Sequence, residues 1–315
     1  MARAGLNALP PPPLPDLDES LVRRLVAEQF PEWAGRPVTA VVPGGVDNRT
    51  FRLGDDLSVR LPAGPGYASQ VAKEQRWLPV LGRQLPLAVP APVGLGAPGQ
   101  GYPFAWSVYR WLDGETAAAA GGVDLLSLAV DLGGFLTALR QVDPTGGPGP
   151  GEHNFFRGGP LRTYEGETHA VIAALGGAVD GVACAAVWRE AMGATWGAAP
   201  VWLHGDVAAG NLLLCEGRLS AVIDFGTSGV GDPACDLVIA WTLFEGTSRA
   251  AFRRAVGLDD GTWARARGWA IWKALITLAG TPDGRSPAAD RAREGARRTI
   301  RALLGDTAER GRQNS

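Results

Sequence analysis

The chain of 315 residues has little cysteine, little lysine and almost no net charge. Its 30 Lys+Arg against 32 Asp+Glu give a formal charge of −2, whereas a dedicated nucleic-acid binder usually carries a basic excess. The three cysteines, Cys184, Cys215 and Cys235, form no CxxC pair. We therefore expect no disulfide framework, no zinc site and a reducing, cytoplasmic location. No apolar run reaches the roughly 18 residues of a membrane-spanning helix, so no membrane partner is expected.

Lysine is the scarcest charged residue, since Lys73 and Lys273 are the only two and arginine supplies the other positive charges. The remaining composition is that of an ordinary globular protein, with 46% hydrophobic residues, enough to bury a core. At this length the chain is expected to form one large domain or two lobes.

The first third of the chain is predicted to be rich in β-structure. Short runs of alternating and β-branched residues between turn signals predict an antiparallel meander of three strands, with a fourth strand later. These strands are expected at 38–42, 49–53, 57–61 and 104–111, with helices at 17–30 and 68–85 and a Pro/Gly-rich connector at 86–101. Residues 1–16 contain a proline cluster and no signal-peptide core, and are predicted to form a flexible leader.

The rest of the chain is predicted to be mainly helical. Helical segments are expected over 123–141, 161–196 and 233–304, with a loop at 143–160 and a small hairpin of strands 211–215 and 219–224. The predicted fold class is therefore α+β and bilobal. A nucleotide-binding lobe over 1–112 would be followed by a catalytic and substrate-binding lobe over 113–315, with a cleft suited to a nucleotide.

The most informative segment is His204-Gly205-Asp206, followed by Asn211 and then by Asp224-Phe225-Gly226. Phosphoryl transfer to a hydroxyl needs a carboxylate that orients the hydroxyl and oxygen ligands for magnesium. Asp206 is predicted to be the catalytic base, and Asn211 and Asp224 the metal ligands. The hairpin between them would bring the two metal ligands together.

In these motifs the sequence resembles the aminoglycoside phosphotransferase family, relatives of the protein kinases. The family reads HGD where protein kinases read HRD, and the stretch Gly231-Asp232-Pro233-Ala234-Cys235-Asp236 also matches. The resemblance implies a protein-kinase-like fold and magnesium-dependent transfer of phosphate from ATP or GTP to a small molecule. It also implies constitutive activity, because Gly205 replaces the arginine that pairs with a phosphorylated activation loop in protein kinases.

The resemblance assigns nucleotide-binding roles in the first lobe. Gly45 and Asn48 would belong to the loop that covers the phosphates, although a plain hairpin turn is the alternative. Arg60 stands where the family's phosphate-binding lysine is expected, with Glu74 as its partner. The alternative is an exposed strand arginine and an impaired enzyme. The adenine would bond to the Arg110 carbonyl and the Leu112 amide.

Two further residues are predicted to support the catalytic loop. His204 is expected to pack beneath the loop and fix its backbone by a hydrogen bond, rather than act as base or metal ligand. Asp236 would brace the same loop, as the resemblance implies, or simply cap the helix that follows.

The substrate is the least determined part of the prediction. An aminoglycoside or related antibiotic is favoured as acceptor, which would make the protein a resistance enzyme. The Arg-rich C-terminal region weakens the case for a polycationic substrate. A macrolide kinase, a metabolite kinase of the choline, homoserine or sugar type, and an impaired nucleotide-binding protein remain alternatives. The oligomeric state is not predicted.

Overall fold

The computed structural model describes residues 14–42, 44–45, 47–281, 284 and 286–313. The chain divides into two compact units, one of Met1–Gln75 with Pro92–Trp111 and one of Arg76–Ala91 with Leu112–Ser315. Most of the predicted leader, residues 1–13, lies outside the described residues. The lobe boundary after residue 112 stays a prediction.

The first unit contains a five-stranded antiparallel sheet in the order β1-β2-β3-β5-β4. The predicted meander and the later strand are confirmed, with bounds shifted by a few residues. The strands are β1 (Val38–Ala40), β2 (Asn48–Leu53), β3 (Leu57–Pro62), β4 (Pro92–Gly96) and β5 (Trp106–Arg110).

Strand β4 lies inside the segment that the sequence indicated to be a connector, and that prediction was wrong here. Its proline and glycines mask the strand pattern, but β4 is an edge strand, where proline is tolerated. Gly96 has a packing role, because a Cβ atom there would lie 2.0 Å from the Trp106 ring.

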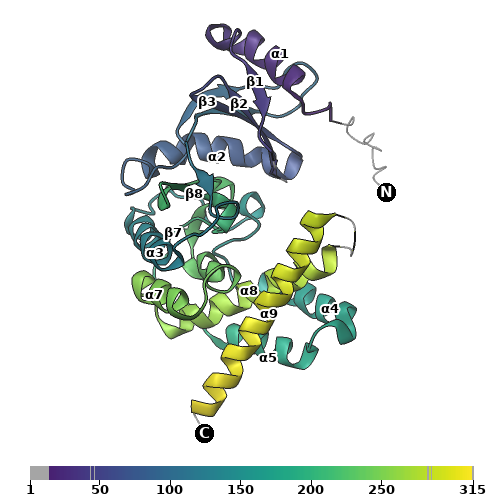
Figure 1. The fold of residues 1–315 in the computed structure, drawn as a ribbon, viewed down its shortest axis with the longest axis vertical. Helices are drawn as coiled ribbons and strands as arrows, with labels where there is room; N and C mark the ends of the chain where they lie inside the picture. The colour runs from purple at the N-terminus through teal and green to yellow at the C-terminus, as the bar shows by residue number, and fades with distance from the viewer. Residues whose placement is uncertain (1–13, 43, 46, 282–283, 285, 314–315) are drawn as a thin grey trace, which may run out of the picture. The chain divides into compact units, whose positions relative to one another are not determined.

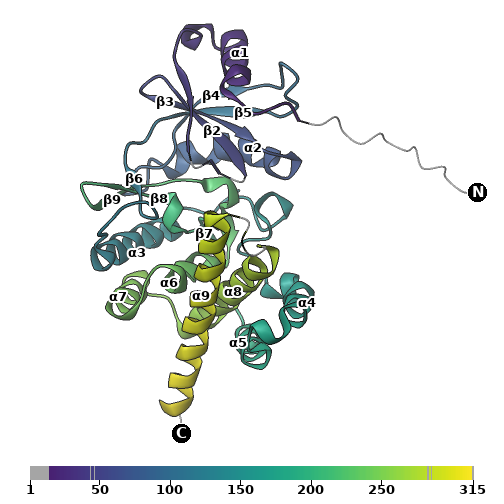
Figure 2. The same ribbon diagram turned by 45° about the vertical axis from the view of Figure 1, so that its right-hand side comes forward.

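Helix α1 (Glu19–Gln29) covers this sheet with its apolar stripe (Figure 2). Asp18 caps the helix by accepting the Leu21 N–H at 2.8 Å. Leu21 and Leu25 are fully buried in one cluster with Phe51 and Trp106 of the sheet. The 3-10 turn η1 (Pro31–Trp33) follows α1, and α2 (Pro65–Leu81) runs from the first unit into the second.

The second unit is mainly helical, which together with the sheet confirms the predicted α+β class. Its α-helices are α3 (Leu125–Gln141), α4 (Glu165–Leu175), α5 (Gly181–Gly193), α6 (Ile239–Thr242), α7 (Gly246–Val256), α8 (Asp260–Gly280) and α9 (Pro287–Gln313). Its 3-10 turns are η2 (Glu152–Asn154), η3 (Leu161–Tyr164), η4 (Gly176–Ala178), η5 (Ala209–Asn211), η6 (Phe225–Thr227) and η7 (Pro233–Val238).

Short strands in this unit flank the loops that contain residues 204–211 and 224–226. They are β6 (Glu115–Thr116), β7 (Val201–Leu203), β8 (Leu212–Cys215), β9 (Arg218–Val222) and β10 (Gly229–Gly231). Strand β8 pairs with β6 and β9, and β7 pairs with β10. The predicted hairpin is thus β8–β9, whereas β6, β7 and β10 were not predicted.

Helix α8 is the centre of the second unit, since it packs against α4, α5, α9 and η7. Asp259 caps it by accepting the Thr262 N–H at 2.7 Å. Figure 1 shows α9 crossing α8 on its way to the C-terminus. Over the described residues, no helix has the length and apolarity needed to cross a bilayer.

Candidate active site

The segment His204-Gly205-Asp206 follows strand β7 directly and forms a tight loop. Gly205 has a φ of +87°, a conformation that side chains with a Cβ rarely adopt. A Cβ atom at this position would lie 2.4 Å from the carbonyl oxygen of Thr227, which follows the Asp224-Phe225-Gly226 motif. The glycine therefore lets the two motif segments touch backbone to backbone. An arginine at this position would force them apart.

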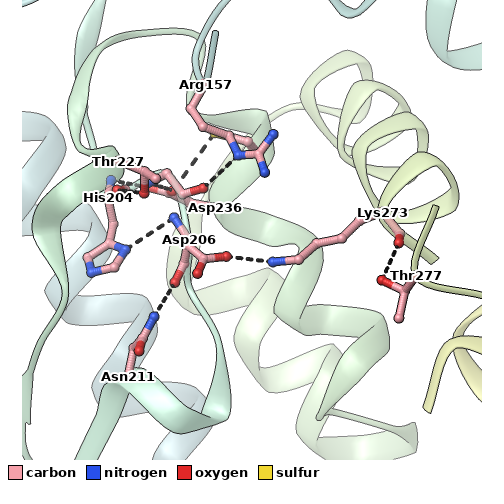
Figure 3. A network of polar contacts seen from close by, with 10 residues as sticks. Arg157, His204, Asp206, Asn211, Thr227, Asp236, Lys273 and Thr277 are labelled. Atoms are coloured by element: carbon pink, nitrogen blue, oxygen red, sulfur yellow. Dashed lines mark hydrogen bonds and ion pairs between the residues drawn. The ribbon is translucent and has the colours of Figure 1, made fainter. Parts of the chain in front are cut away.

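Asp236 braces this loop through two hydrogen bonds to its backbone (Figure 3). Its carboxylate accepts the backbone N–H of His204 at 2.8 Å and that of Gly205 at 2.7 Å. Burial raises the pKa of Asp236, while His204 and these backbone N–H groups lower it. Asp236 lies inside η7, and the cap of that turn is Asp232, so the alternative of a simple helix cap is wrong.

His204 is completely buried and ties the loop to the neighbouring hairpin. Its Nδ1 atom accepts the Asp206 N–H at 3.2 Å, so the ring proton lies on Nε2, which is 3.0 Å from the carbonyl oxygen of Ile223. The ring also packs edge-on against Phe225, with the ring centres 4.6 Å apart. Both ring nitrogens are thus occupied in positioning the backbone.

Asn211 and Asp224 come close together through the β8–β9 hairpin. Asn211 Nδ2 donates to the Asp206 carbonyl at 2.9 Å, which turns its side-chain oxygen the other way. The Ile223 N–H donates to the Asn211 carbonyl at 2.9 Å, so Asp224 is the next residue along the chain from this contact. Asp224 adopts the left-handed conformation, with a φ of 68°.

This donor set fits magnesium. Amide and carboxylate oxygens are the ligands that magnesium prefers, and it usually takes only one or two from the protein, the rest being water and phosphate. In the described part of the chain, no group of three or more His, Cys, Asp or Glu residues could hold a metal ion alone. Asn211 and Asp224 therefore suit an ion that arrives with a nucleotide.

Asp206 itself is half-exposed and has a partner that sequence reasoning missed. Lys273 of α8 donates to its Oδ1 atom at 2.5 Å (Figure 3). Burial acts to raise the pKa of Asp206, but Lys273, His204 and Arg157 outweigh it and bring that pKa below its ordinary value. The carboxylate is therefore ionised at neutral pH and available as a hydrogen-bond acceptor.

Arg157 is the second residue that sequence reasoning missed. Its Nε atom donates to the Gly205 carbonyl at 3.1 Å. Its guanidinium lies 5.1 Å and 5.0 Å from the ring centres of Trp269 and Trp272, both on α8. The sequence held one indication of Lys273, which is one of only two lysines and follows a tryptophan in the lobe expected to bind substrate.

The predicted nucleotide-binding residues lie in the first unit, except Leu112. On β3, Arg60 donates to Glu74 at 3.4 Å, and Glu74 also accepts the Tyr109 hydroxyl at 2.7 Å.

The other predicted nucleotide-binding residues lie at strand ends and at the start of the second unit. Gly45 precedes β2 and Asn48 begins it, where Asn48 is almost fully buried. Arg110 ends β5 and pairs with Asp56 at 3.0 Å, while Leu112 opens the long segment of the second unit. The nucleotide-binding roles of these six residues stay predictions.

Comparison with known proteins shows which family the chain matches. Residues 38–269, well over half of the chain, match the profile of the phosphotransferase enzyme family. A stretch of 46 residues is 41% identical to an aminoglycoside 3'-phosphotransferase of Escherichia coli, and it covers 15% of this chain and 17% of that relative.

Solved structures share the fold at low sequence identity. The GDP and kanamycin complex of APH(2")-IIia has a TM-score of 0.69 at 19% identity, over 91% of this chain and 98% of that one. The macrolide 2'-phosphotransferase MphH from Brachybacterium faecium has a TM-score of 0.58 at 21% identity, over 89% of this chain and 97% of that one. With the family profile spanning both motif segments, the chain belongs to the phosphotransferase enzyme family, as its catalytic motifs indicate.

Proposed function

We propose that this protein transfers the γ-phosphoryl group of ATP or GTP to a hydroxyl group of a small molecule, with magnesium as the required ion. The observation that carries the proposal is the grouping of Asp206, Asn211 and Asp224 on a loop and hairpin that His204 and Asp236 hold in place. A loop that had lost its chemistry would have no need of this bracing.

Asp206 orients the acceptor hydroxyl toward the phosphorus atom. As the hydroxyl oxygen bonds to phosphorus, the bond to the bridging β–γ oxygen breaks, nucleoside diphosphate leaves, and the hydroxyl proton passes to Asp206. Its lowered pKa makes Asp206 a weak base, so orientation is its larger contribution. This suits a loose transition state, in which the proton leaves late.

Asn211 and Asp224 would hold the magnesium ion through their side-chain oxygens. The bound ion supplies charge neutralisation for the nucleotide phosphates. In the first unit, Arg60 would contact the phosphates while Glu74 fixes its guanidinium. The known structures of the fold include complexes with GDP and with ADP, which supports nucleotide binding without deciding between ATP and GTP.

The sequence favours an antibiotic acceptor, and the structural neighbours include kinases of aminoglycosides and of macrolides. A resistance role and a cytoplasmic location stay predictions on that basis. Metabolite kinases use the same motifs, so the residues of the pocket beside Asp206, and not the motifs, determine the acceptor.

The test measures ADP or GDP release by the purified protein with magnesium, each nucleotide and a panel of hydroxylated compounds. We expect turnover on at least one class, and a loss of about 100-fold or more for Asp206→Asn, as for other general-base losses. Asp260→Asn is the matched control, because this carboxylate lies exposed at the start of α8. Near-full activity of Asp206→Asn would show that the base is misassigned.

A further inference from the structure

The pocket beside Asp206 has more positively than negatively charged side chains in its wall. Arg157 and Lys273 line it together with Trp269, Trp272 and the loop backbone, and among the described residues of its wall Asp206 alone is acidic. Two cations against one carboxylate leave one net positive charge. An amino group entering this pocket would meet both cations.

Arg157 has hydrogen-bonding capacity to spare. Its Nε atom is used by the Gly205 carbonyl, but its Nη1 atom is buried and makes no hydrogen bond within the described structure. A buried donor without an acceptor is unfavourable, so such donors are rare in folded proteins and each one calls for an explanation. The flanking rings of Trp269 and Trp272 keep this guanidinium facing the pocket.

Lys273 can exchange its partner. Its side chain is 38% exposed and that of Asp206 is 35% exposed, so solvent weakens their ion pair. Asp206 Oδ2 makes no hydrogen bond to any described residue, which leaves it open to a hydroxyl group while Lys273 occupies Oδ1. Lys273 can therefore bind a second oxyanion as well as Asp206.

Asp236 lies on the far side of the loop, where its carboxylate accepts two backbone N–H groups, and a further carboxylate belongs to Glu167 of α4. It accepts the Trp272 Nε1–H at 2.7 Å, on the indole that stacks with Arg157. This bond fixes the tryptophan, and Glu167 is not part of the pocket wall. It does not satisfy the free Arg157 donor.

We propose that the phosphate acceptor is a hydroxy acid, whose carboxylate lies between Arg157 and Lys273 while its hydroxyl group bonds to Asp206. A single negative charge balances the pocket, whereas a polycation would add to its positive charge. This inference rests on the proposed function, because it names the acceptor of that same reaction. Its specificity-determining residues are Arg157 and Lys273.

The experiment uses three probes that share a hydroxymethyl-phenyl body and differ in one para group of negative, neutral or positive charge: 4-(hydroxymethyl)benzoate, 4-(hydroxymethyl)benzamide and 4-(hydroxymethyl)benzylamine. Binding to the full-length protein is followed by ligand-observed NMR, and nucleoside diphosphate release is measured in parallel, with kanamycin as a fourth compound. We expect the benzoate to bind roughly tenfold more tightly than the amide and the amine most weakly, as charge-assisted hydrogen bonds predict.

The variants assign the effect to the two cations. Lys273→Met and Arg157→Met should each weaken benzoate binding by roughly tenfold, with amide binding changed by less than about twofold. Lys273→Arg should keep the preference. Arg301→Met, which removes an exposed cation of α9, is the control and should change neither.

Binding and turnover separate this inference from the proposed function. Equal binding of the three probes, tighter binding of the amine, or no benzoate binding overturns the hydroxy-acid proposal. So does higher kcat/KM for kanamycin than for the carboxylate probe, which would leave the phosphotransferase function standing. A charge preference that Lys273→Met removes, without turnover on any hydroxyl compound, would instead support the pocket assignment and count against the proposed function.

Discussion

Two pairs of opposite charge, one in each unit of the molecule, show how differently the same interaction can be used. Arg60 and Glu74 lie 14 residues apart on β3 and α2, with side chains that are 13% and 6% exposed. Lys273 and Asp206 lie 67 residues apart, with side chains that are 38% and 35% exposed.

The two pairs differ in how far water can solvate their charges. The buried pair has a third member, Tyr109, and burial raises the pKa of that hydroxyl well above its ordinary value, so it remains a donor to Glu74. Charges that are removed from water must stay paired. The half-exposed pair can separate without such a penalty. The first pair therefore fixes structure, and the second can open for a ligand.

Breaking the buried pair should have the largest effect on stability. Glu74→Gln leaves the Arg60 guanidinium without its carboxylate, and we expect the free energy of unfolding to fall by about 3 kcal/mol. Chemical denaturation with fluorescence detection of the tryptophans measures this directly. A loss below about 1 kcal/mol would mean that the two pairs do not differ as described.

Exchanging the cation of the buried pair should have a smaller effect. Arg60→Lys keeps the positive charge but loses the planar guanidinium, which can donate two parallel hydrogen bonds. We therefore expect the KM for ATP or GTP to rise roughly tenfold. Nucleotide titrations of the wild type and the variant provide the measurement. A large gain in turnover would instead mean that the natural arginine impairs the site.

Lys73, next to Glu74 in the chain, is buried, and its burial should make the stability of the protein depend on pH. Burial lowers the pKa of Lys73 from its ordinary value of 10.5 to about 8, although Glu74 acts to raise it. Between these values the unfolded chain binds more protons than the folded one, so this group's contribution to stability improves as the pH rises. At pH 7 its full penalty is present.

We therefore expect Lys73→Met to be more stable relative to the wild type at pH 7 than at pH 10, by more than about 1 kcal/mol. Denaturation at both pH values gives the two differences. A constant difference would show that Lys73 has an ordinary pKa in the folded protein.

Breaking the half-exposed pair should have the smallest effect on stability. Lys273→Met should change the free energy of unfolding by less than about 1 kcal/mol, as for other exposed ion pairs. The same denaturation assay serves, with Glu74→Gln beside it. A loss as large as that of Glu74→Gln would remove the distinction between a fixed pair and an exchangeable one.

The parts of the site that the sequence predicted are local in the chain. The motif from His204 to Asp224 spans a loop and one hairpin, so spacing alone brings its members together. The α+β class also followed from periodicity. Strand β4 did not, because its Pro and Gly residues are explained only by its edge position and by the Trp106 ring.

The acceptor side was not predictable for a different reason. Arg157 comes from a Gly/Pro-rich loop and does not stand out in the sequence. Lys273 stands out only as one of two lysines, in a helix whose residues are mostly buried. They reach Asp206 through the packing of α8 against η7 and the other helices. Contacts made by tertiary packing do not follow from a fixed spacing in the sequence, so they could not be predicted from it.

The close approach of Gly205 to the Thr227 carbonyl has an evolutionary consequence. At 2.4 Å, any side chain at this position requires the segment after Asp224 to move as well. A one-step change from glycine to arginine would therefore break the site before it could create a phosphate-controlled switch. Control of this site by a phosphorylated loop would therefore require several coordinated substitutions in this chain.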